Sequence, residues 1–335
     1  MIDLTLSQVP LYLRRRFLPV PDGCCPDVEA CLGSGVLLLE WAGIETARLD
    51  VECILAEVLG LSRWQVILEP RRRLTPEAFG EYLWLLQRRE QREPLAYVLG
   101  KREFWSLPLS VSSGVLVPRP ETETLVEATL ALWRETQPAV AASREPSTPG
   151  MATRPAIVEL CTGSGAVAIA LARELPEARL LATDISWRAL RVARANAAAH
   201  GVGDRILWLR GNLWRAVNGE APAGSLDLVV ANPPYIPSAA IEGLMPEVQW
   251  EPRRALDGGP DGLQLVREIV VTSPDRLRAG GWLLLEIGAD QAAAATELFV
   301  RSGRFSTPRH FRDLAGRVRV VAAQRTANLE IRWTS

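Results

Sequence analysis

The residues best suited to chemistry without a strong base lie in one short stretch, Asn232-Pro233-Pro234-Tyr235. The asparagine side-chain oxygen can accept one N–H, and a backbone carbonyl of the stiff Pro233-Pro234 segment can accept a second. Tyr235 offers an aromatic face for a planar group. These properties suit an –NH2 group that must be held still while its nitrogen is methylated, because catalysis then depends on positioning and on stabilising developing charge. The simpler interpretation is that two prolines end a strand.

A second set of residues points to a ligand with a sugar. It begins with a glycine-rich loop, made of Cys161, Thr162, Gly163, Ser164 and Gly165. The two glycines allow a tight turn and close approach of a ligand, and the helix that follows offers free N–H groups. Asp184 stands 21 residues after Gly163 at the end of the next apolar run, where a carboxylate can accept both hydroxyls of a ribose.

Two classes of ligand satisfy this pattern. Gly163, Gly165 and Ala168 also match G-x-G-x-x-A, which is typical of dinucleotide-binding dehydrogenases. S-adenosylmethionine is the alternative ligand. Its ribose can be bound by the same acid, but it has no pyrophosphate that would require a phosphate-binding loop. The glycine loop alone does not choose between them. Asn232 to Tyr235 favour a methyltransferase, because hydride transfer has no obvious use for that stretch.

Both motifs follow apolar runs of the length expected for buried strands. The expected strands are residues 156–161, 179–184, 206–210, 226–231, 281–287 and 317–323, with helical patterns at 165–175, 186–200 and 261–279. Buried strands separated by helices predict a doubly wound, mostly parallel α/β sheet with helices on both faces. Ligands of such sheets bind outside the carboxyl ends of the strands, where both motifs lie.

The rest of the chain is expected to divide into parts of different character. In order they are an irregular extension at 1–26, a helical domain at 27–100, a hairpin or linker at 101–120, a catalytic domain at 121–325 with a proline-rich surface insertion at 137–155, and a tail at 326–335. Within the helical domain, Thr75-Pro76-Glu77 predicts a helix start, with a hydroxyl N-cap followed by proline and an acid.

The composition excludes several classes of protein. The chain has 335 residues, 48% hydrophobic and 23% charged, and a net charge of −1, so it is not expected to be a general polyanion binder. Its five cysteines form no C-x-x-C pair and it has two histidines, which argues against a metal site. We find no signal-peptide pattern and no apolar run near the ~18–20 residues of a membrane helix. We therefore expect a cytoplasmic protein.

Taken in order along the chain, the motifs resemble those of the protein-glutamine N5-methyltransferases that modify peptide chain release factors, the PrmC/HemK family. The resemblance covers about residues 43–324 and rests on "REPLAYVLGKREFWSLPLSVSSGVLVPRPETE", "TGSG", "ATDIS", "NPPYIP", "EPRRALDGGPDGLQLVREI" and "GWLLLEIGADQ". It implies a class I S-adenosylmethionine-dependent methyltransferase fold with a seven-stranded sheet and a small N-terminal α-helical domain.

The resemblance also implies roles for individual residues. Residues 161–165, Asp184 and Asn232 would bind S-adenosylmethionine, and Leu213 would lie on the adenine side. Residues 232–235 would clamp the glutamine of the release factor's Gly-Gly-Gln tip, with the helical domain helping to dock that factor. No direct nucleic acid, no membrane and no metal is implied, and we expect a monomer.

Some features depart from the family pattern or leave alternatives open. Asn212 and Glu159 stand where aspartate is usual, which affects the adenine contact and the methionine end of the cofactor site respectively. The alternatives are a glutamine methyltransferase acting on a ribosomal protein, an amino-group methyltransferase acting on nucleic acid, and a non-catalytic cofactor-binding module. "REFWSLPL" and "PRPETE" favour the release-factor branch, and the intact Asn232–Tyr235 stretch argues against a non-catalytic module.

Overall fold

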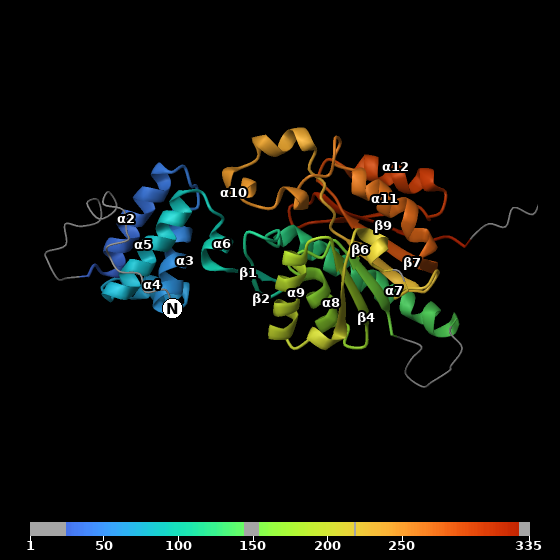
Figure 1. Cartoon of the computed structure of the whole chain (residues 1–335), viewed down its shortest axis with the longest axis horizontal. Helices are drawn as coiled ribbons and strands as arrows, with labels where there is room; N and C mark the ends of the chain where they lie inside the picture. The colour runs from blue at the N-terminus through green and yellow to red at the C-terminus, as the bar shows by residue number, and fades with distance from the viewer. Residues whose placement is uncertain (1–24, 144–153, 218, 328–335) are drawn as a thin grey trace, which may run out of the picture. The chain divides into compact units, whose positions relative to one another are not determined.

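The structure is a computed structural model that describes residues 25–143, 154–217 and 219–327 (Figure 1). These residues form two compact units. Unit 1 contains the described residues up to Gly100 together with Met245–Trp250. Unit 2 contains Lys101–Leu244 and the described residues from Glu251 onward, so the predicted hairpin segment belongs to the same unit as the sheet.

Unit 1 is built of helices. They are α2 (Val28–Trp41), α3 (Ala47–Leu59), α4 (Arg63–Leu68), α5 (Pro76–Glu90), α6 (Leu95–Leu99) and the short α10 (Pro246–Gln249). The predicted start of α5 is confirmed, since the Thr75 hydroxyl accepts a hydrogen bond from the Ala78 N–H at 3.2 Å. In the core, the Tyr82 hydroxyl donates to the Cys31 carbonyl at 2.7 Å, and a Cβ on Gly35 would clash with that hydroxyl. Glycine at this position lets α2 approach α5 closely.

The segment after the Asn-Pro-Pro-Tyr stretch contributes an ion-pair cluster to unit 1. Arg89 of α5, which is buried, donates to Asp50 at 2.7 Å and to Glu247 of α10 at 3.0 Å. Arg92 donates to the second oxygen of Glu247 at 2.8 Å. Burial raises the pKa of Glu247, but the hydrogen bonds from Arg92 and Arg89 outweigh it and leave the pKa below its usual value. Residues 245–250 are therefore held in unit 1 by charge-assisted hydrogen bonds.

Unit 2 contains a hairpin, β1 (Lys101–Phe104) with β2 (Leu107–Ser110), and a seven-stranded sheet. The strands of the sheet are β3 (Ala156–Leu160), β4 (Arg179–Asp184), β5 (Ile206–Arg210), β6 (Leu226–Ala231), β7 (Leu277–Glu286), β8 (Arg309–Arg312) and β9 (Val318–Gln324). Their order is β5-β4-β3-β6-β7-β9-β8, parallel from β5 to β7 and antiparallel for β9 and β8. The predicted doubly wound, mostly parallel sheet is confirmed.

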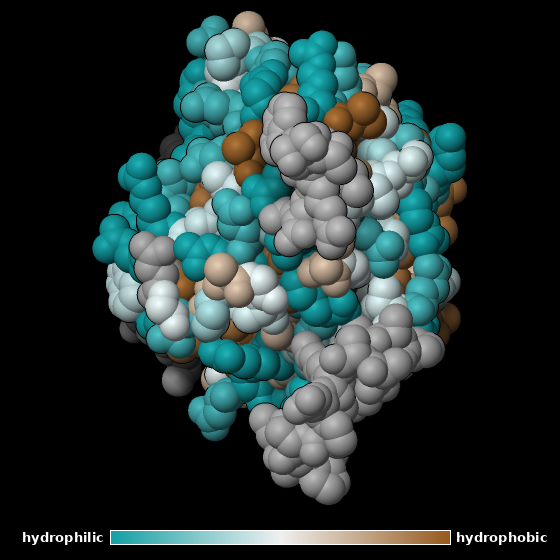
Figure 2. All heavy atoms as spheres, turned by 90° about the vertical axis from the view of Figure 1, so that its right-hand side faces the viewer, coloured by the Kyte–Doolittle hydropathy of each residue, from teal (hydrophilic) through white to brown (hydrophobic). Residues whose placement is uncertain are grey.

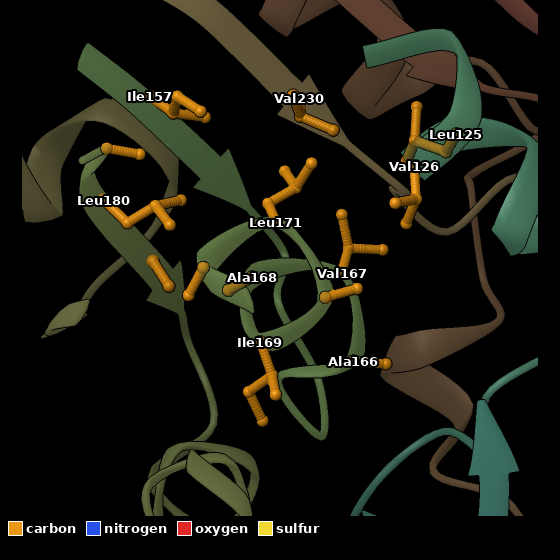
Figure 3. Close-up of a cluster of buried hydrophobic side chains, with 14 of the residues drawn as sticks. Leu125, Val126, Ile157, Ala166, Val167, Ala168, Ile169, Leu171, Leu180 and Val230 are labelled. Atoms are coloured by element: carbon orange, nitrogen blue, oxygen red, sulfur yellow. The ribbon is translucent and has the colours of Figure 1, made fainter. Parts of the chain in front are cut away.

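Alternate residues of the strands face opposite layers of helices, as a buried sheet requires. One layer holds α7 (Glu123–Ser143), α8 (Ala166–Glu174) and α9 (Trp187–Ala199), and the other holds α11 (Gln264–Thr272) and α12 (Ala292–Ser302). Figure 3 shows the first layer, where Ile157, Leu180 and Val230 from three neighbouring strands surround Leu171 of α8. This packing fixes the strand ends that carry the motifs.

Some boundaries differ from the sequence prediction. The first strand ends at Leu160 instead of 161, because Cys161 has φ +60°, which no strand residue adopts. The strand predicted at 281–287 begins earlier, at Leu277. β8 was not predicted, since its sequence Arg-His-Phe-Arg has no apolar run and β8 lies at the edge of the sheet.

The helix before the predicted insertion is longer than its sequence suggests. α7 continues to Ser143, so the first part of the segment 137–155 is helical and not an irregular insertion. Alanine has the highest helix propensity and occurs three times between Pro138 and Ser143, which favours this continuation. Residues 144–153 of the predicted insertion, residues 1–24 of the predicted extension and residues 328–335 of the predicted tail lie outside the described residues.

No helix among the described ranges is both long and apolar enough to cross a bilayer. Figure 2 shows one face on which hydrophilic residues predominate and hydrophobic residues are scattered between them.

Candidate active site

A pocket of about 300 Å³ lies at the carboxyl ends of the parallel strands of unit 2. It collects most of the residues that the sequence singled out. Those that line it are Cys161, Thr162, Gly163, Ser164, Asp184, Leu213, Asn232 and Pro234. Gly165, Pro233 and Tyr235 are adjacent in the chain but are not among the lining residues. β3, β4 and β6 are neighbours in the sheet, which is why their ends meet at one place.

The glycine loop after β3 has the left-handed backbone that its residues suggest. Gly163 has φ +57° and Gly165 has φ +83°. A Cβ built on Gly163 would meet no atom within 4 Å, so this glycine opens onto the pocket, whereas one on Gly165 would come within 3.0 Å of Ala193. The two glycines therefore differ in use: Gly163 admits a ligand, and Gly165 lets the start of α8 pack closely on α9.

The buried Asn196 of α9 holds this loop in place. Its amide donates to the Ser164 carbonyl at 3.0 Å and exchanges hydrogen bonds of 3.0 and 2.8 Å with the backbone of Ser110. The glycine loop and the β1–β2 hairpin are thus joined through one side chain. Sequence reasoning did not single out Asn196, because nothing in its local pattern marks a buried amide.

Asp184, at the end of β4, presents its carboxylate to the pocket. Its Oδ2 accepts the Gly163 N–H at 2.9 Å and its Oδ1 accepts the Ser186 N–H at 2.7 Å. Burial raises the pKa of Asp184, while these backbone hydrogen bonds and the nearby Arg254 act in the opposite direction. Each oxygen keeps a lone pair that can accept a hydroxyl from a ligand.

Glu159, where the predicted resemblance would place an aspartate, also lines the pocket, but its carboxylate is used within the loop. Its Oε2 accepts the Ala168 N–H at 3.1 Å and the Thr162 hydroxyl at 2.5 Å. Burial raises its pKa to about 8 despite these two donors. The longer side chain of glutamate therefore ties β3 to the beginning of α8.

The Asn-Pro-Pro-Tyr stretch is held by a glycine-rich segment that follows it in the chain. Ile236 exchanges backbone hydrogen bonds with Leu256 and Gly258, at 3.0 and 2.8 Å. A Cβ on Gly258 would lie 2.7 Å from the Pro234 carbonyl oxygen, so only glycine fits there. The Gln291 amide donates to the Tyr235 carbonyl at 2.8 Å. The prolines and these contacts together fix the backbone that follows Asn232.

Part of the pocket wall comes from the segment that sequence reasoning assigned to a linker. Val115, Leu116, Pro118 and Arg119 of this segment line the pocket, as does Thr122, which follows it in the predicted catalytic domain. Glu251, which is buried, accepts the Val117 N–H at 2.9 Å and pairs with Arg119, and these contacts hold the segment. The motif "PRPETE" carried the family resemblance, but only the fold shows that it reaches the pocket.

The pocket suits a ligand with a hydroxylated sugar and an apolar, flat part. Asp184 and the open backbone at Gly163 supply the polar side, while Val115, Ile185 and Leu213 supply apolar walls. Leu213 has φ +44° and Cys161 has φ +60°, so strained residues flank the pocket on two loops. Strain of this kind is concentrated at functional sites.

This sheet, with a pocket at the ends of β3, β4 and β6, together with the match to a methyltransferase family model, identifies a methyltransferase of the doubly wound class. A family model described as "Methyltransferase small domain" matches residues 148–247, and one described as "PrmC N-terminal domain" matches residues 31–100. Among solved structures, the hMettl16 catalytic domain in complex with MAT2A 3′UTR hairpin 1 has a TM-score of 0.50 at 16% identity, covering 77% of this chain and 84% of that chain. At that identity the likeness shows the fold alone.

Closer relatives identify the family. Proteins named release factor glutamine methyltransferase from Moorella thermoacetica, Geobacter sulfurreducens and Gloeobacter violaceus are 40%, 39% and 41% identical to this chain. The matches cover 89%, 78% and 81% of this chain and 98%, 84% and 88% of those proteins. The chain belongs to the release factor glutamine methyltransferase family. The predicted resemblance is confirmed, and the dehydrogenase alternative is wrong.

Proposed function

We propose that this protein transfers a methyl group from S-adenosylmethionine to the side-chain amide nitrogen (N5) of the glutamine in the Gly-Gly-Gln motif of class 1 release factors. One observation carries the proposal. Asn232 and Pro234 line the same pocket as Gly163 and Asp184. The chain that carries this pocket is 40% identical over 298 residues to the release factor glutamine methyltransferase of Moorella thermoacetica. On this proposal, the acceptor for the amide and the site for the adenosyl group lie in one pocket.

The residues that would hold S-adenosylmethionine are those of the loop and strand ends. Asp184 would accept the ribose hydroxyls, residues 161–165 and Asn232 would contact the cofactor from the loop and from the end of β6, and Leu213 would lie on the adenine side. The open space at Gly163 fits such a ligand. When bound, the cofactor supplies a methyl group on a sulfonium sulfur, and its transfer to nitrogen leaves a neutral thioether and releases one proton.

The glutamine amide would be clamped by the Asn-Pro-Pro-Tyr stretch. The Asn232 oxygen accepts one amide N–H, and a carbonyl of the Pro233-Pro234 segment accepts the other. The Tyr235 ring holds the amide flat. Because both hydrogens are engaged, the nitrogen lone pair is freed for attack as its delocalisation is lost, and no strong base is needed.

The helical unit would help dock the release factor. Trp41 is 79% exposed, Trp64 67% and Leu68 77%, and these large apolar side chains would supply contact area for the release factor. We further propose that the protein acts in the cytoplasm as a monomer, without direct contact to nucleic acid or membrane. We also propose that the division predicted from the sequence, into a docking domain, a hairpin and a catalytic domain, reflects these separate roles.

Mass spectrometry that locates the methyl group tests the proposal. The purified chain is incubated with labelled S-adenosylmethionine and a class 1 release factor, and label is expected on the Gly-Gly-Gln glutamine. A release factor with alanine in place of that glutamine is the control and should remain unlabelled.

The same assay separates the alternatives. Label on a ribosomal protein offered in parallel would support the related glutamine methyltransferases, and label on nucleic acid would support amino-group methylation of a base. Cofactor binding by calorimetry without label on any of these substrates would indicate a non-catalytic module. Each of these results would overturn the release-factor assignment.

A further inference from the structure

One buried acid next to the pocket has no role in the clamp described above. Glu286, the last residue of β7, is 1% exposed, and its Oε2 atom has no hydrogen-bond partner among the described residues. Leaving a carboxylate oxygen buried without a partner is costly. The groups around Glu286 suggest what offsets this cost.

A chain of three side chains leads from Glu286 to the clamp. The Asn232 Nδ2 donates to the Thr122 hydroxyl at 3.2 Å. The side chains of Thr122 and Asn232 also lie close enough to the Glu286 carboxyl group to lower its pKa as hydrogen-bond donors. Thr122 is 5% exposed and comes from the Pro-Glu-Thr turn, far from Asn232 in sequence. Three distant segments thus meet at the asparagine that lines the pocket.

The chemistry of these groups gives the chain of hydrogen bonds a direction. An ionised carboxylate only accepts hydrogen bonds, so the Thr122 hydroxyl donates to it, and the Thr122 oxygen in turn accepts the hydrogen bond from Asn232. Only the NH2 end of the asparagine amide can supply that hydrogen. The oxygen at the other end of the planar amide is thereby turned away from Thr122.

We propose that Glu286 is a positioning residue that acts through Thr122 to hold the Asn232 oxygen toward the pocket, ready to accept an N–H of the substrate amide. This inference rests on the proposed function, since an amide substrate is what needs that oxygen. It assigns a task to the acid of "LLLEIG" and to the threonine of "PRPETE", two motifs for which the clamp alone has no use.

The charges around Glu286 make the arrangement sensitive to pH. Burial raises the pKa of Glu286 to about 7, with Thr122, Arg319 and Asn232 acting to lower it and Glu121 acting to raise it. Tyr235 stays neutral in this range, because burial and the Glu286 charge raise its pKa to about 12. A protonated Glu286 can donate to Thr122 and reverse the chain, so the productive amide orientation is lost as pH falls through about 7.

Substitutions at Thr122 and Glu286 test the inference by methyl-transfer kinetics between pH 6 and 9. Thr122→Val removes the hydroxyl and should lower kcat about 10- to 100-fold, while KM and cofactor affinity change little. Thr122→Ser keeps the hydroxyl and should restore most of kcat. Glu286→Gln should lower kcat and remove the rise of kcat across pH 7. Glu297→Gln, an exposed glutamate in α12, is the matched control and should keep the wild-type profile.

A second measurement does not depend on the substrate. The carboxyl carbon of Glu286, followed by NMR, should titrate near pH 7 in the wild-type chain and at higher pH in Thr122→Val, because a donor to the carboxylate is lost. An unchanged midpoint would overturn the inference even if no release factor is methylated, which separates its failure from that of the proposed function. Wild-type kcat in Thr122→Val, or an unchanged pH profile in Glu286→Gln, would also overturn it. If Glu286→Gln does not fold, the Thr122 pair and the titration decide.

Discussion

At the scale of single residues, the pocket combines side chains that are ordinary in type but unusual in surroundings. Asn232 is half-buried beside Thr122, and Glu159 and Glu286 are carboxyl groups almost wholly removed from water. Burial raises the pKa of both acids, to about 8 and about 7. Glu159 and Glu286 therefore change protonation state within the range of pH in which enzymes are usually assayed.

Replacing Asn232 with alanine tests the clamp directly. Loss of the acceptor oxygen should reduce kcat by about 100-fold or more, by analogy with the removal of a single group that stabilises a transition state. Cofactor binding, measured by calorimetry, should persist in part, because Gly163 and Asp184 are unchanged. Turnover equal to that of the wild-type protein would refute the clamp.

Glu159→Gln should flatten the dependence of stability on pH. The folded state keeps a proton on Glu159 up to about pH 8, whereas the unfolded chain loses it near the ordinary value of 4.5. The free energy of unfolding contributed by this group therefore falls as pH rises from about 4.5 to about 8, and is constant above. Urea unfolding at several pH values measures this slope. An identical slope in the variant would contradict the assignment.

At the scale of elements, the glycine loop between β3 and α8 is the most constrained part of the site. Cys161, at φ +60°, occupies a conformation that L-residues rarely adopt, and Gly163 and Gly165 follow with φ of +57° and +83°. Two side chains hold the loop: Asn196 donates to the Ser164 carbonyl, and Glu159 accepts the Ala168 N–H. Burial raises the pKa of the Cys161 thiol, so it stays protonated and acts as a small apolar group.

Substitutions at Cys161 should show this backbone requirement. Cys161→Val should destabilise the chain by roughly 1–2 kcal/mol, because a β-branched residue fits φ +60° poorly. Cys161→Gly should stay within about 1 kcal/mol of wild type, since glycine adopts this conformation freely. Denaturant unfolding of the two variants compares them. Equal stability of the valine and glycine variants would show that the loop relaxes.

At the scale of the whole molecule, the chain passes between its two units more than once. It leaves unit 2 after Leu244, contributes Met245–Trp250 to unit 1 and re-enters unit 2 at Glu251. Ion pairs hold the chain on both sides of this crossing. In unit 1, Glu247 pairs with Arg89 and Arg92. In unit 2, Glu251 pairs with Arg119. Each unit thus contains residues from distant parts of the chain.

Trp64→Ala tests the docking role of the helical unit. If the exposed indole contacts the release factor, KM for that factor should rise about tenfold, equivalent to roughly 1.4 kcal/mol, while kcat and cofactor affinity stay constant. Leu314→Ala, which removes an exposed hydrophobic residue from unit 2, is the matched control and should leave KM unchanged. An unaltered KM in Trp64→Ala would remove this residue from the docking surface.

The sequence by itself determined the parallel strands and which candidate residues meet at their carboxyl ends. The strands at 179–184, 206–210 and 226–231 have the predicted bounds, because buried parallel strands are continuous apolar runs that end abruptly at polar residues. The glycine loop, Asp184 and Asn232 could be placed at one edge for the same reason: parallel strands all end on the same side. These inferences needed only local patterns and the geometry of a parallel sheet.

Only the tertiary structure decided which distant segments complete the site. Thr122 lies 110 residues before Asn232, and Glu286 ends a later strand, so no local pattern relates them. β8 escaped prediction because an edge strand needs no apolar run. Local periodicity reflects which face of an element is buried, whereas a hydrogen bond between side chains depends on how elements pack. That packing brings Glu286 and Thr122 next to the asparagine of the clamp.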